Sequence, residues 1–160
     1  MRKPEDARMS KDNTAIRVIN ACKSFHKNRP ALKAINLSVD SGSCVGLLGA
    51  SGSGKSTLLR SLCGLERLDD PHSAVQLWGH TLQQGGQLSP DIRQLRTHVG
   101  IIFQQFNLVG RMDVLTNVMT GLLPRVPLYR SLMGRFTARE RLQALEALQA
   151  VGLSEQAFQR

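Results

Sequence analysis

A chain of 160 residues with 41% hydrophobic residues is long enough for one soluble domain with a hydrophobic core. It has no apolar run of about 18 residues that could span a bilayer, and residues 1–15 are polar, without the apolar segment of a secretory signal. A formal net charge of +9 is typical of proteins that bind nucleic acid or anionic membranes, but the arginines between residues 93 and 141 are dispersed, so we expect no nucleic acid.

The first half of the chain alternates between strand and turn signals before its first helix. Residues 16–20 and Ala34–Val39 alternate apolar and polar side chains, which predicts two strands of a small antiparallel sheet. Cys44–Leu48 is instead a continuous apolar run, as in a strand buried on both faces of a parallel sheet. Glycines interrupt this run from Gly49, and the leucine spacing over residues 55–63 then predicts a helix.

Shorter elements are expected between this helix and residue 105. The pattern predicts a strand at Ala74–Trp78, a loop at Gln83–Pro90 and a short helix at Asp91–Arg96. Val99–Phe103 is a second continuous apolar run, followed by Gln104 and Gln105. It predicts a second buried strand of the parallel sheet.

The last third of the chain is expected to be helical. Asp113 is placed to open one helix, and Pro124–Gly134, with two prolines, predicts a loop. Thr137 and Glu140 have the spacing of a capping box, so a second helix is expected from there to Ala150. The apolar stripe of this helix would consist of Leu142, Leu145 and Leu148.

Neither the cysteines nor the histidines have the spacing of a metal site. Cys22, Cys44 and Cys63 are an odd number without a CxxC pair, which also argues against a disulfide framework. The four histidines are scattered along the chain. We therefore expect neither a zinc site nor structural disulfides.

The stretch between the first apolar run and its helix satisfies the phosphate-binding pattern G-x-x-x-x-G-K-[ST]. It consists of Gly49, Ala50, Ser51, Gly52, Ser53, Gly54, Lys55, Ser56 and Thr57. Glycines let backbone N–H groups approach a triphosphate closely, and the helix N-terminus that follows favours its charge. Lys55 can reach the β- and γ-phosphates, and the Ser56 hydroxyl can ligate Mg²⁺. A glycine-rich turn could match by accident, but the strand and helix on either side favour a site for ATP with Mg²⁺.

Segments on either side of the glycine-rich loop indicate which family of phosphate-loop proteins the chain resembles. Lys23-Ser24-Phe25 followed by Ala31–Leu37, and later Val99–Leu108, resemble the ATP-binding subunits of ABC transporters. The resemblance implies that Phe25 stacks on adenine and that Gln104 is the Q-loop glutamine, which meets Mg²⁺ or the attacking water. The alternative for Phe25 is a phenylalanine of the hydrophobic core. The alternative for Gln104 is a glutamine that only ends a strand, but its position downstream of Lys55 makes this the poorer interpretation.

Other stretches are similar to phosphonate-importer ATPases. They are Asp91–Arg93, Phe103–Leu108, Val114–Val118, Gly121–Leu123, Arg130–Leu132, Ala144–Leu153 and Ala157–Arg160. The resemblance implies uptake of phosphonate or a related small anion. It also implies three partners, a second ATPase subunit, a transmembrane permease and a periplasmic binding protein, at the cytoplasmic face of the cell inner membrane. Leu108–Gly134 is the candidate permease-facing surface, with a solvated loop and helix face as the alternative.

The expected fold is α/β, a partial P-loop NTPase of the ABC type. Residues 1–15 would be a flexible extension, residues 16–110 the nucleotide-binding core with its antiparallel subdomain and parallel sheet, and residues 111–160 the start of a helical subdomain. The LSGGQ-type segment, the acid-terminated strand and the switch histidine of the family are absent from the sequence. We therefore expect little ATPase activity from these 160 residues alone, and marginal stability, because the apolar runs would be partly uncovered.

Two further interpretations remain open. One is a non-transport ATPase of the same superfamily, which salt-sensitive binding to nucleic acid would support. The other is a truncated, non-hydrolysing remnant, which a frameshift or stop codon followed by family sequence would reveal. An LSGGQ segment and an acid-terminated strand encoded just beyond residue 160 would favour the transport ATPase.

Overall fold

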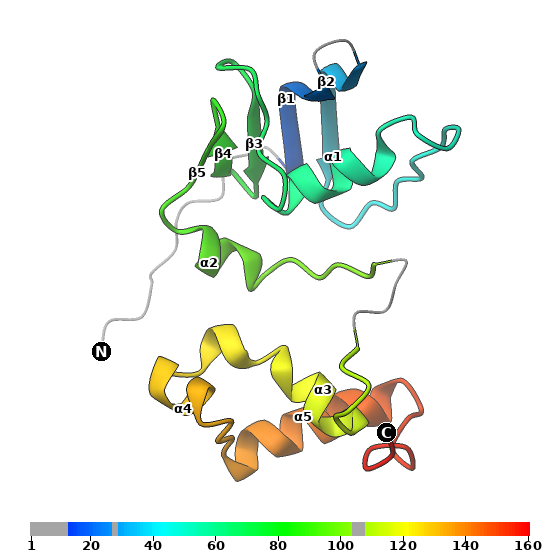
Figure 1. Ribbon diagram of the computed structural model, residues 1–160, viewed down its shortest axis with the longest axis vertical. Helices are drawn as coiled ribbons and strands as arrows, with labels where there is room; N and C mark the ends of the chain where they lie inside the picture. The colour runs from blue at the N-terminus through cyan, green and yellow to red at the C-terminus, as the bar shows by residue number, and fades with distance from the viewer. Residues whose placement is uncertain (1–12, 27–28, 104–107) are drawn as a thin grey trace. The chain divides into compact units, whose positions relative to one another are not determined.

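The computed structural model describes residues 13–26, 29–103 and 108–160. The chain divides into two compact units, Met1–Val99 and Gly100–Arg160. The first contains a β-sheet with two helices, and the second contains helices (Figure 1).

The sheet of the first unit has five strands in the order β2-β1-β3-β4-β5, all antiparallel to their neighbours. The strands are β1 (Thr14–His26), β2 (Arg29–Asp40), β3 (Ala74–Leu77), β4 (His80–Gln84) and β5 (Gln87–Leu88). Val18 lies at the centre, where it pairs with Leu37 of β2 and Val75 of β3. The two alternating segments predicted as antiparallel strands are therefore confirmed, and both strands extend further than the alternation does.

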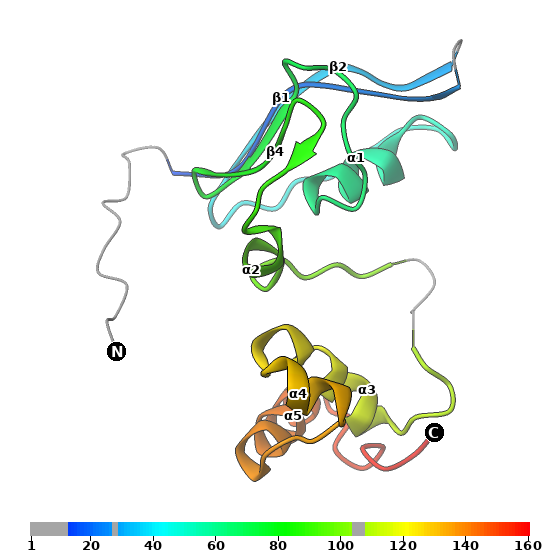
Figure 2. The same ribbon diagram turned by 60° about the vertical axis from the view of Figure 1, so that its left-hand side comes forward.

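One helix packs on this sheet and a second extends its core. Helix α1 (Lys55–Leu62) lies along one face of the β1–β2 hairpin (Figure 2). Helix α2 (Ile92–Arg96) confirms the short helix predicted at this position, and its Ile92 and Leu95 are partly buried. The core shared by the sheet and α1 consists of Val18, Ala21, Leu32, Leu58, Leu62, Cys63, Leu68, Val75, Leu77 and Leu82.

Three predictions of strand or loop between residues 44 and 103 were wrong. Cys44–Leu48 and Val99–Phe103 are not strands, and their side chains are largely exposed, Leu48 by 93% and Ile102 by 94%. A buried parallel strand needs hydrogen-bonding neighbours and helices on both faces, and no segment in the described ranges supplies them. The loop expected at Gln83–Pro90 is instead part of a hairpin, because Gly85 and Gly86 adopt the positive φ angles of a tight turn between β4 and β5.

The second unit is built from α3 (Val114–Thr120), the 3₁₀ turn η1 (Leu123–Arg125), α4 (Leu128–Leu132) and α5 (Ala138–Ala150). Its core consists of Leu115, Met119, Ala144, Leu148 and Ala157. The loop predicted at Pro124–Gly134 was wrong, since this range contains the last two residues of η1 and the whole of α4. Pro124 sits in the first turn of η1 and Pro127 at the N-cap of α4, positions that need no backbone N–H.

Both predicted helix caps are present. Asp113 accepts a hydrogen bond of 2.6 Å from the backbone N–H of Thr116 at the start of α3. At the start of α5, Thr137 and Glu140 exchange the two hydrogen bonds of a capping box. Within the predicted apolar stripe of α5, Leu148 is buried and Leu145 packs against the core, whereas Leu142 is 55% exposed and Ala144 takes the inner position.

These caps predict acid sensitivity of the helical unit. The backbone N–H of Thr116 lowers the pKa of Asp113, and the backbone N–H of Thr137 lowers the pKa of Glu140. A carboxylate with a lowered folded-state pKa stabilises the fold above its unfolded pKa and loses that contribution as the pH falls through its folded pKa. We expect far-UV circular dichroism to show constant helicity down to about pH 4.5 and a decline below about pH 4.

The matched comparison is the double variant Asp113→Asn with Glu140→Gln. Both amides keep an oxygen that accepts the capping hydrogen bond, but neither titrates in this range. Its helicity should therefore change less between pH 5 and pH 3 than that of the unmodified chain. Equal acid transitions in the two proteins would show that the caps do not contribute to the pH dependence.

Candidate functional site

The glycine-rich stretch predicted as a phosphate loop leads directly into α1. Gly52 and Gly54 have φ angles of +79° and +91°, in the left-handed region that glycine adopts readily. Gly54 is the N-cap of α1, and its carbonyl accepts the hydrogen bond of 2.9 Å from Leu58 N–H that closes the first turn. The loop therefore ends at a helix N-terminus, where unpaired N–H groups favour an anion.

The atoms around position 54 leave room only for glycine. A Cβ atom at this position would lie 2.2 Å from the carbonyl oxygen of Ala31 and 3.3 Å from the Leu32 side chain, both on β2. The end of the loop thus packs closely against the β1–β2 hairpin. At the start of the loop, a Cβ atom on Gly49 would lie 2.7 Å from Ser53 Oγ. A side chain at position 54 would overlap backbone atoms and prevent the observed loop conformation, whereas one at position 49 would displace the Ser53 hydroxyl.

The side chain of Lys55 folds back over the loop. Its Nζ donates hydrogen bonds to the carbonyl oxygens of Gly49 at 2.6 Å and Ala50 at 2.8 Å, and it lies 3.4 Å from Ser53 Oγ. The ammonium group is therefore held among atoms of the loop. Because residues 49–53 are exposed, an arriving phosphate can reach both the ammonium and the backbone N–H groups.

The first turn of α1 also presents the predicted metal ligand. Ser56 is exposed there, and Thr57 is half-buried behind it. Among the residues that the structure describes, no cluster of three or more histidine, cysteine or carboxylate side chains could hold a metal ion. One exposed hydroxyl fits Mg²⁺ that arrives bound to phosphate, because Mg²⁺ keeps several waters and takes few protein ligands. Gln104, the second predicted ligand, lies outside the described residues.

The far end of α1 is anchored by two polar side chains that the sequence did not single out. Gln83, from β4, donates to the carbonyl oxygens of Ser61 and Glu66 and accepts from the backbone N–H of Leu68. Arg96, from α2, donates to the carbonyl oxygens of Cys63 and Gly64. These bonds satisfy carbonyl groups at the C-terminal end of α1, and so fix the helix whose N-terminus forms the site.

We predict that Gln83→Ala destabilises the protein by about 1–3 kcal/mol, because Leu68 N–H is left buried without its partner. Thermal unfolding followed by circular dichroism measures this. Gln84→Ala, at the exposed neighbouring position of β4, is the control and should change the unfolding temperature little. Equal effects of the two substitutions would contradict the anchoring role of Gln83.

The structure brings Phe25 to the same side of the unit as the loop. Lys23 pairs with Leu32 of β2, which contacts the position of Gly54, and Phe25 follows two residues further along β1. The Phe25 side chain is 53% exposed, so it is not part of the core. The Lys23 ammonium lies 5.5 Å from the centre of its ring. An exposed aromatic ring and the glycine-rich loop thus lie at the same end of the hairpin.

The family model described as "ABC transporter" matches residues 32–160, which include the whole loop and every helix that the structure describes. This chain belongs to the ABC transporter family. The family model begins on β2, so Phe25 lies before the matched range.

Curated relatives of this ABC protein include phosphonate-import proteins. The chain is 48% identical over 146 residues to the phosphonates import ATP-binding protein PhnC 1 of Cupriavidus metallidurans, covering 91% of this chain and 51% of that protein. It is 48% identical over 149 residues to PhnC 1 of Pseudomonas aeruginosa, covering 92% and 53%. The chain thus spans about half the length of the curated relatives it matches.

Solved ABC cassettes share the fold. The dimeric structure of MJ0796, a bacterial ABC transporter cassette, matches with a TM-score of 0.71 and 28% identity, covering 89% of this chain and 60% of that chain. A nucleotide-free ATP-binding cassette from an ABC transporter matches with a TM-score of 0.72 and 25% identity, covering 91% and 57%. No helix within the described ranges is both long and apolar enough to cross a membrane.

Proposed function

We propose that this chain binds Mg-ATP and forms the nucleotide-binding part of an ABC importer ATPase for phosphonate or a related small anion. The observation that carries the nucleotide site is the position of the Lys55 ammonium, held within 2.8 Å of two loop carbonyl oxygens at the N-terminus of α1. The identity of 48% to phosphonates import proteins supports the choice of substrate class.

Each part of the site has a proposed role. Backbone N–H groups from Gly49 to Ser56 surround the terminal phosphates, and Lys55 moves from the loop carbonyls to the β- and γ-phosphates as they bind. Ser56 takes one coordination position of Mg²⁺, whose charge offsets that of the phosphates. The exposed ring of Phe25 receives the adenine. Gln104, outside the described residues, is the proposed sensor of the γ-phosphate, with a carbonyl that can meet Mg²⁺ or the attacking water.

The proposed assembly pairs two ATPase subunits with a permease and a periplasmic binding protein at the cytoplasmic face of the inner membrane. The dimeric cassette structure that shares this fold supports the pairing of two subunits. Residues 108–134 are the proposed permease-facing surface. On α4 within this range, Leu128, Tyr129 and Leu132 are exposed by 73%, 66% and 80%, which leaves apolar area for a protein partner.

Binding and turnover are separable in this proposal. The sequence contains no apolar run that ends in paired acids, and phosphoryl transfer to water needs a residue that positions the water. We propose that these 160 residues alone bind Mg-ATP and hydrolyse it at a negligible rate. Phosphate release by the unmodified chain that Lys55→Ala abolishes would contradict the proposed negligible rate of hydrolysis.

A chimera tests the transport function. Residues 16–160 replace the corresponding part of the PhnC 1 protein of Pseudomonas aeruginosa, in a strain that lacks its own copy and depends on phosphonate uptake. The proposal predicts uptake of labelled phosphonate by the chimera and none by the same chimera with Lys55→Ala. A stable chimera that binds ATP without supporting uptake would contradict the transport role, and tight, salt-sensitive binding to nucleic acid would favour a non-transport ATPase.

A further inference from the structure

The end of β1 that carries Phe25 pairs with β2 on one side, and on the other side the segment that follows α1 holds it. Pairing between β1 and β3 stops at Ile19, which pairs with Ala74. Beyond it, Ser73 Oγ donates to the Asn20 carbonyl at 2.6 Å and accepts from Cys22 N–H at 3.3 Å. Beyond the end of β3, a side chain of the segment that follows α1 therefore makes the hydrogen bonds to β1 that a paired strand would make.

Asp69 completes this connection with a carboxylate and a backbone N–H group. One carboxylate oxygen accepts from Lys23 Nζ at 2.8 Å, and the other accepts from the backbone N–H of Ser24 at 2.7 Å. The backbone N–H of Asp69 in turn donates to the Cys22 carbonyl at 2.9 Å. Three consecutive residues of β1 are thus tied to one aspartate, immediately before the aromatic ring.

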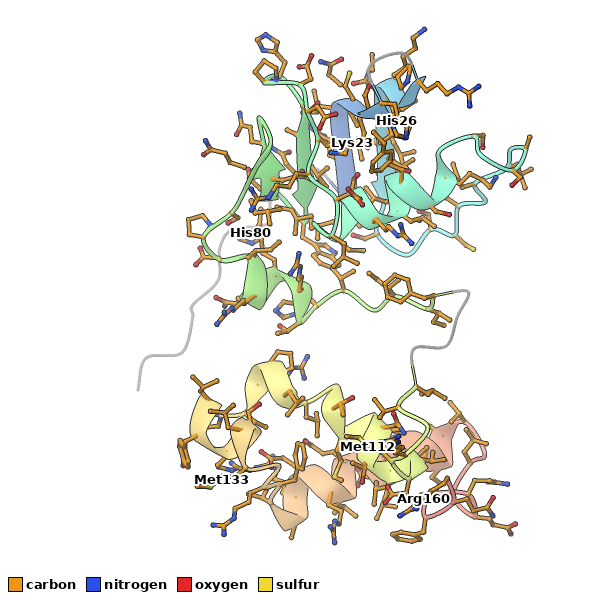
Figure 3. The ribbon with its side chains drawn as sticks, viewed as in Figure 1. Lys23, His26, His80, Met112, Met133 and Arg160 are labelled. Carbon is orange, nitrogen blue, oxygen red and sulfur yellow. The ribbon has the colours of Figure 1, made fainter. Side chains whose placement is uncertain are left out.

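Lys23 also contacts the Phe25 ring. The ammonium lies 5.5 Å from the Phe25 ring centre, at the distance of a cation–π contact. The Lys23 side chain is only 14% exposed, so the Asp69 carboxylate and the strand hold it in place. Figure 3 shows Lys23 and His26, the residues that flank Ser24 and Phe25, at the same end of the hairpin. The ring is 53% exposed, which leaves area on which a base can stack.

A negatively charged Asp69 carboxylate suits the two hydrogen bonds that it accepts from Lys23 and Ser24. Partial burial by itself raises the pKa of the Asp69 carboxyl, but the hydrogen bonds from Lys23 and from Ser24 N–H outweigh it, and the pKa lies below its usual value. The group is therefore a carboxylate at neutral pH, the form that accepts both hydrogen bonds.

We propose that Asp69 is a positioning residue for base recognition, acting through Lys23 and Ser24 to hold the Phe25 ring in place for the adenine of a bound nucleoside triphosphate. This inference rests on the proposed nucleotide site. It connects the segment that follows α1 to the base, whereas the loop before α1 holds the phosphates. Loss of Asp69 should therefore weaken binding of the base and leave binding of the phosphates unchanged.

The test compares the Kd of Mg-ATP with that of Mg-tripolyphosphate, which has the same phosphates and no base. Stacking of one base on an aromatic ring is expected to favour ATP by roughly 5- to 100-fold in the unmodified protein. Phe25→Ala should remove most of this preference. Asp69→Ala should lower it by at least about threefold, with an unchanged Kd for tripolyphosphate, and Asp69→Asn should have an intermediate effect because it keeps one acceptor.

A double-variant cycle separates positioning from general destabilisation. If Asp69 acts through the ring, Asp69→Ala adds nothing to the loss of preference in Phe25→Ala. Asp70→Ala is the matched control, because Asp70 accepts from Asn20 and from His72 N–H and has no hydrogen bond to Lys23 or Ser24. It should leave the preference for ATP unchanged.

The outcomes distinguish the two proposals. A preference that depends on Phe25 and is unaffected by Asp69→Ala overturns the positioning role alone, as does an equal loss of affinity for both ligands. No binding of either ligand by the unmodified protein overturns the nucleotide site and the inference together. Equal binding of both ligands, without an effect of Phe25→Ala, overturns the adenine platform and with it the role of Asp69.

Discussion

Gly54→Ala is expected to reduce the affinity for Mg-ATP by about a hundredfold or more. The added Cβ would lie 2.2 Å from the Ala31 carbonyl oxygen, and the φ angle of +91° is itself costly for alanine. Backbone strain of this kind costs on the order of 1–3 kcal/mol, and the steric overlap with β2 adds to it. The end of the loop must move away from the hairpin, which displaces the N–H groups at the start of α1. Isothermal titration with Mg-ATP measures the loss.

Gly52→Ala provides the control for this effect. Gly52 has a similar φ angle of +79°, but a Cβ atom there would have no neighbour within 4 Å. The substitution adds strain without the overlap, so its effect on ATP affinity should be clearly smaller than that of Gly54→Ala. Equal effects of the two substitutions would show that contact between the loop and β2 is not what requires glycine at position 54.

Lys55→Ala is expected to weaken Mg-ATP binding by about 10- to 100-fold. A charge-assisted hydrogen bond contributes roughly 1.5–3 kcal/mol, and the ammonium already lies among the loop carbonyls where the phosphates would arrive. The stability of the unliganded protein should change little, because the loop and its lysine contacts are exposed. Titration calorimetry and thermal unfolding of the same samples separate the two effects.

Lys33→Ala is the matched control for charge. Lys33 is an exposed lysine of β2, and its loss lowers the net charge by the same amount without changing the loop. If general attraction between a basic protein and an anionic ligand dominated, both substitutions would weaken binding equally and both effects would shrink with salt. A specific role for Lys55 requires a much larger effect at that position.

Local patterns predicted several elements well. Alternation identified β1 and β2, because each strand has one covered face. Asp113 and Thr137 identified the starts of α3 and α5, because their side chains replace hydrogen-bond partners that the first turn of a helix lacks. Residue types alone predict a phosphate loop at Gly49–Thr57, and the structure places this stretch at the N-terminus of α1 with Lys55 folded over it. Its binding of phosphate stays a prediction.

Features that depend on distant partners could not be predicted in this way. A continuous apolar run predicts a buried strand only if other segments cover it, and Leu48 and Ile102 remain exposed in the described ranges. Gln83 occurs in a polar stretch that suggested a loop, although it is buried against the end of α1. Asp69 has no sequence signal of its own, since its partners Lys23 and Ser24 are far away in the chain.

The central claim is that the residues from Gly49 to Ser56, with Lys55, hold the terminal phosphates of a nucleotide. The most direct test is a calorimetric titration of the 160-residue protein with ATP, with and without Mg²⁺, beside the charge-reversed variant Lys55→Glu. We predict saturable binding that is tighter with Mg²⁺ and is lost in the variant. Absence of binding in the unmodified protein, or equal binding by Lys55→Glu, would contradict the account.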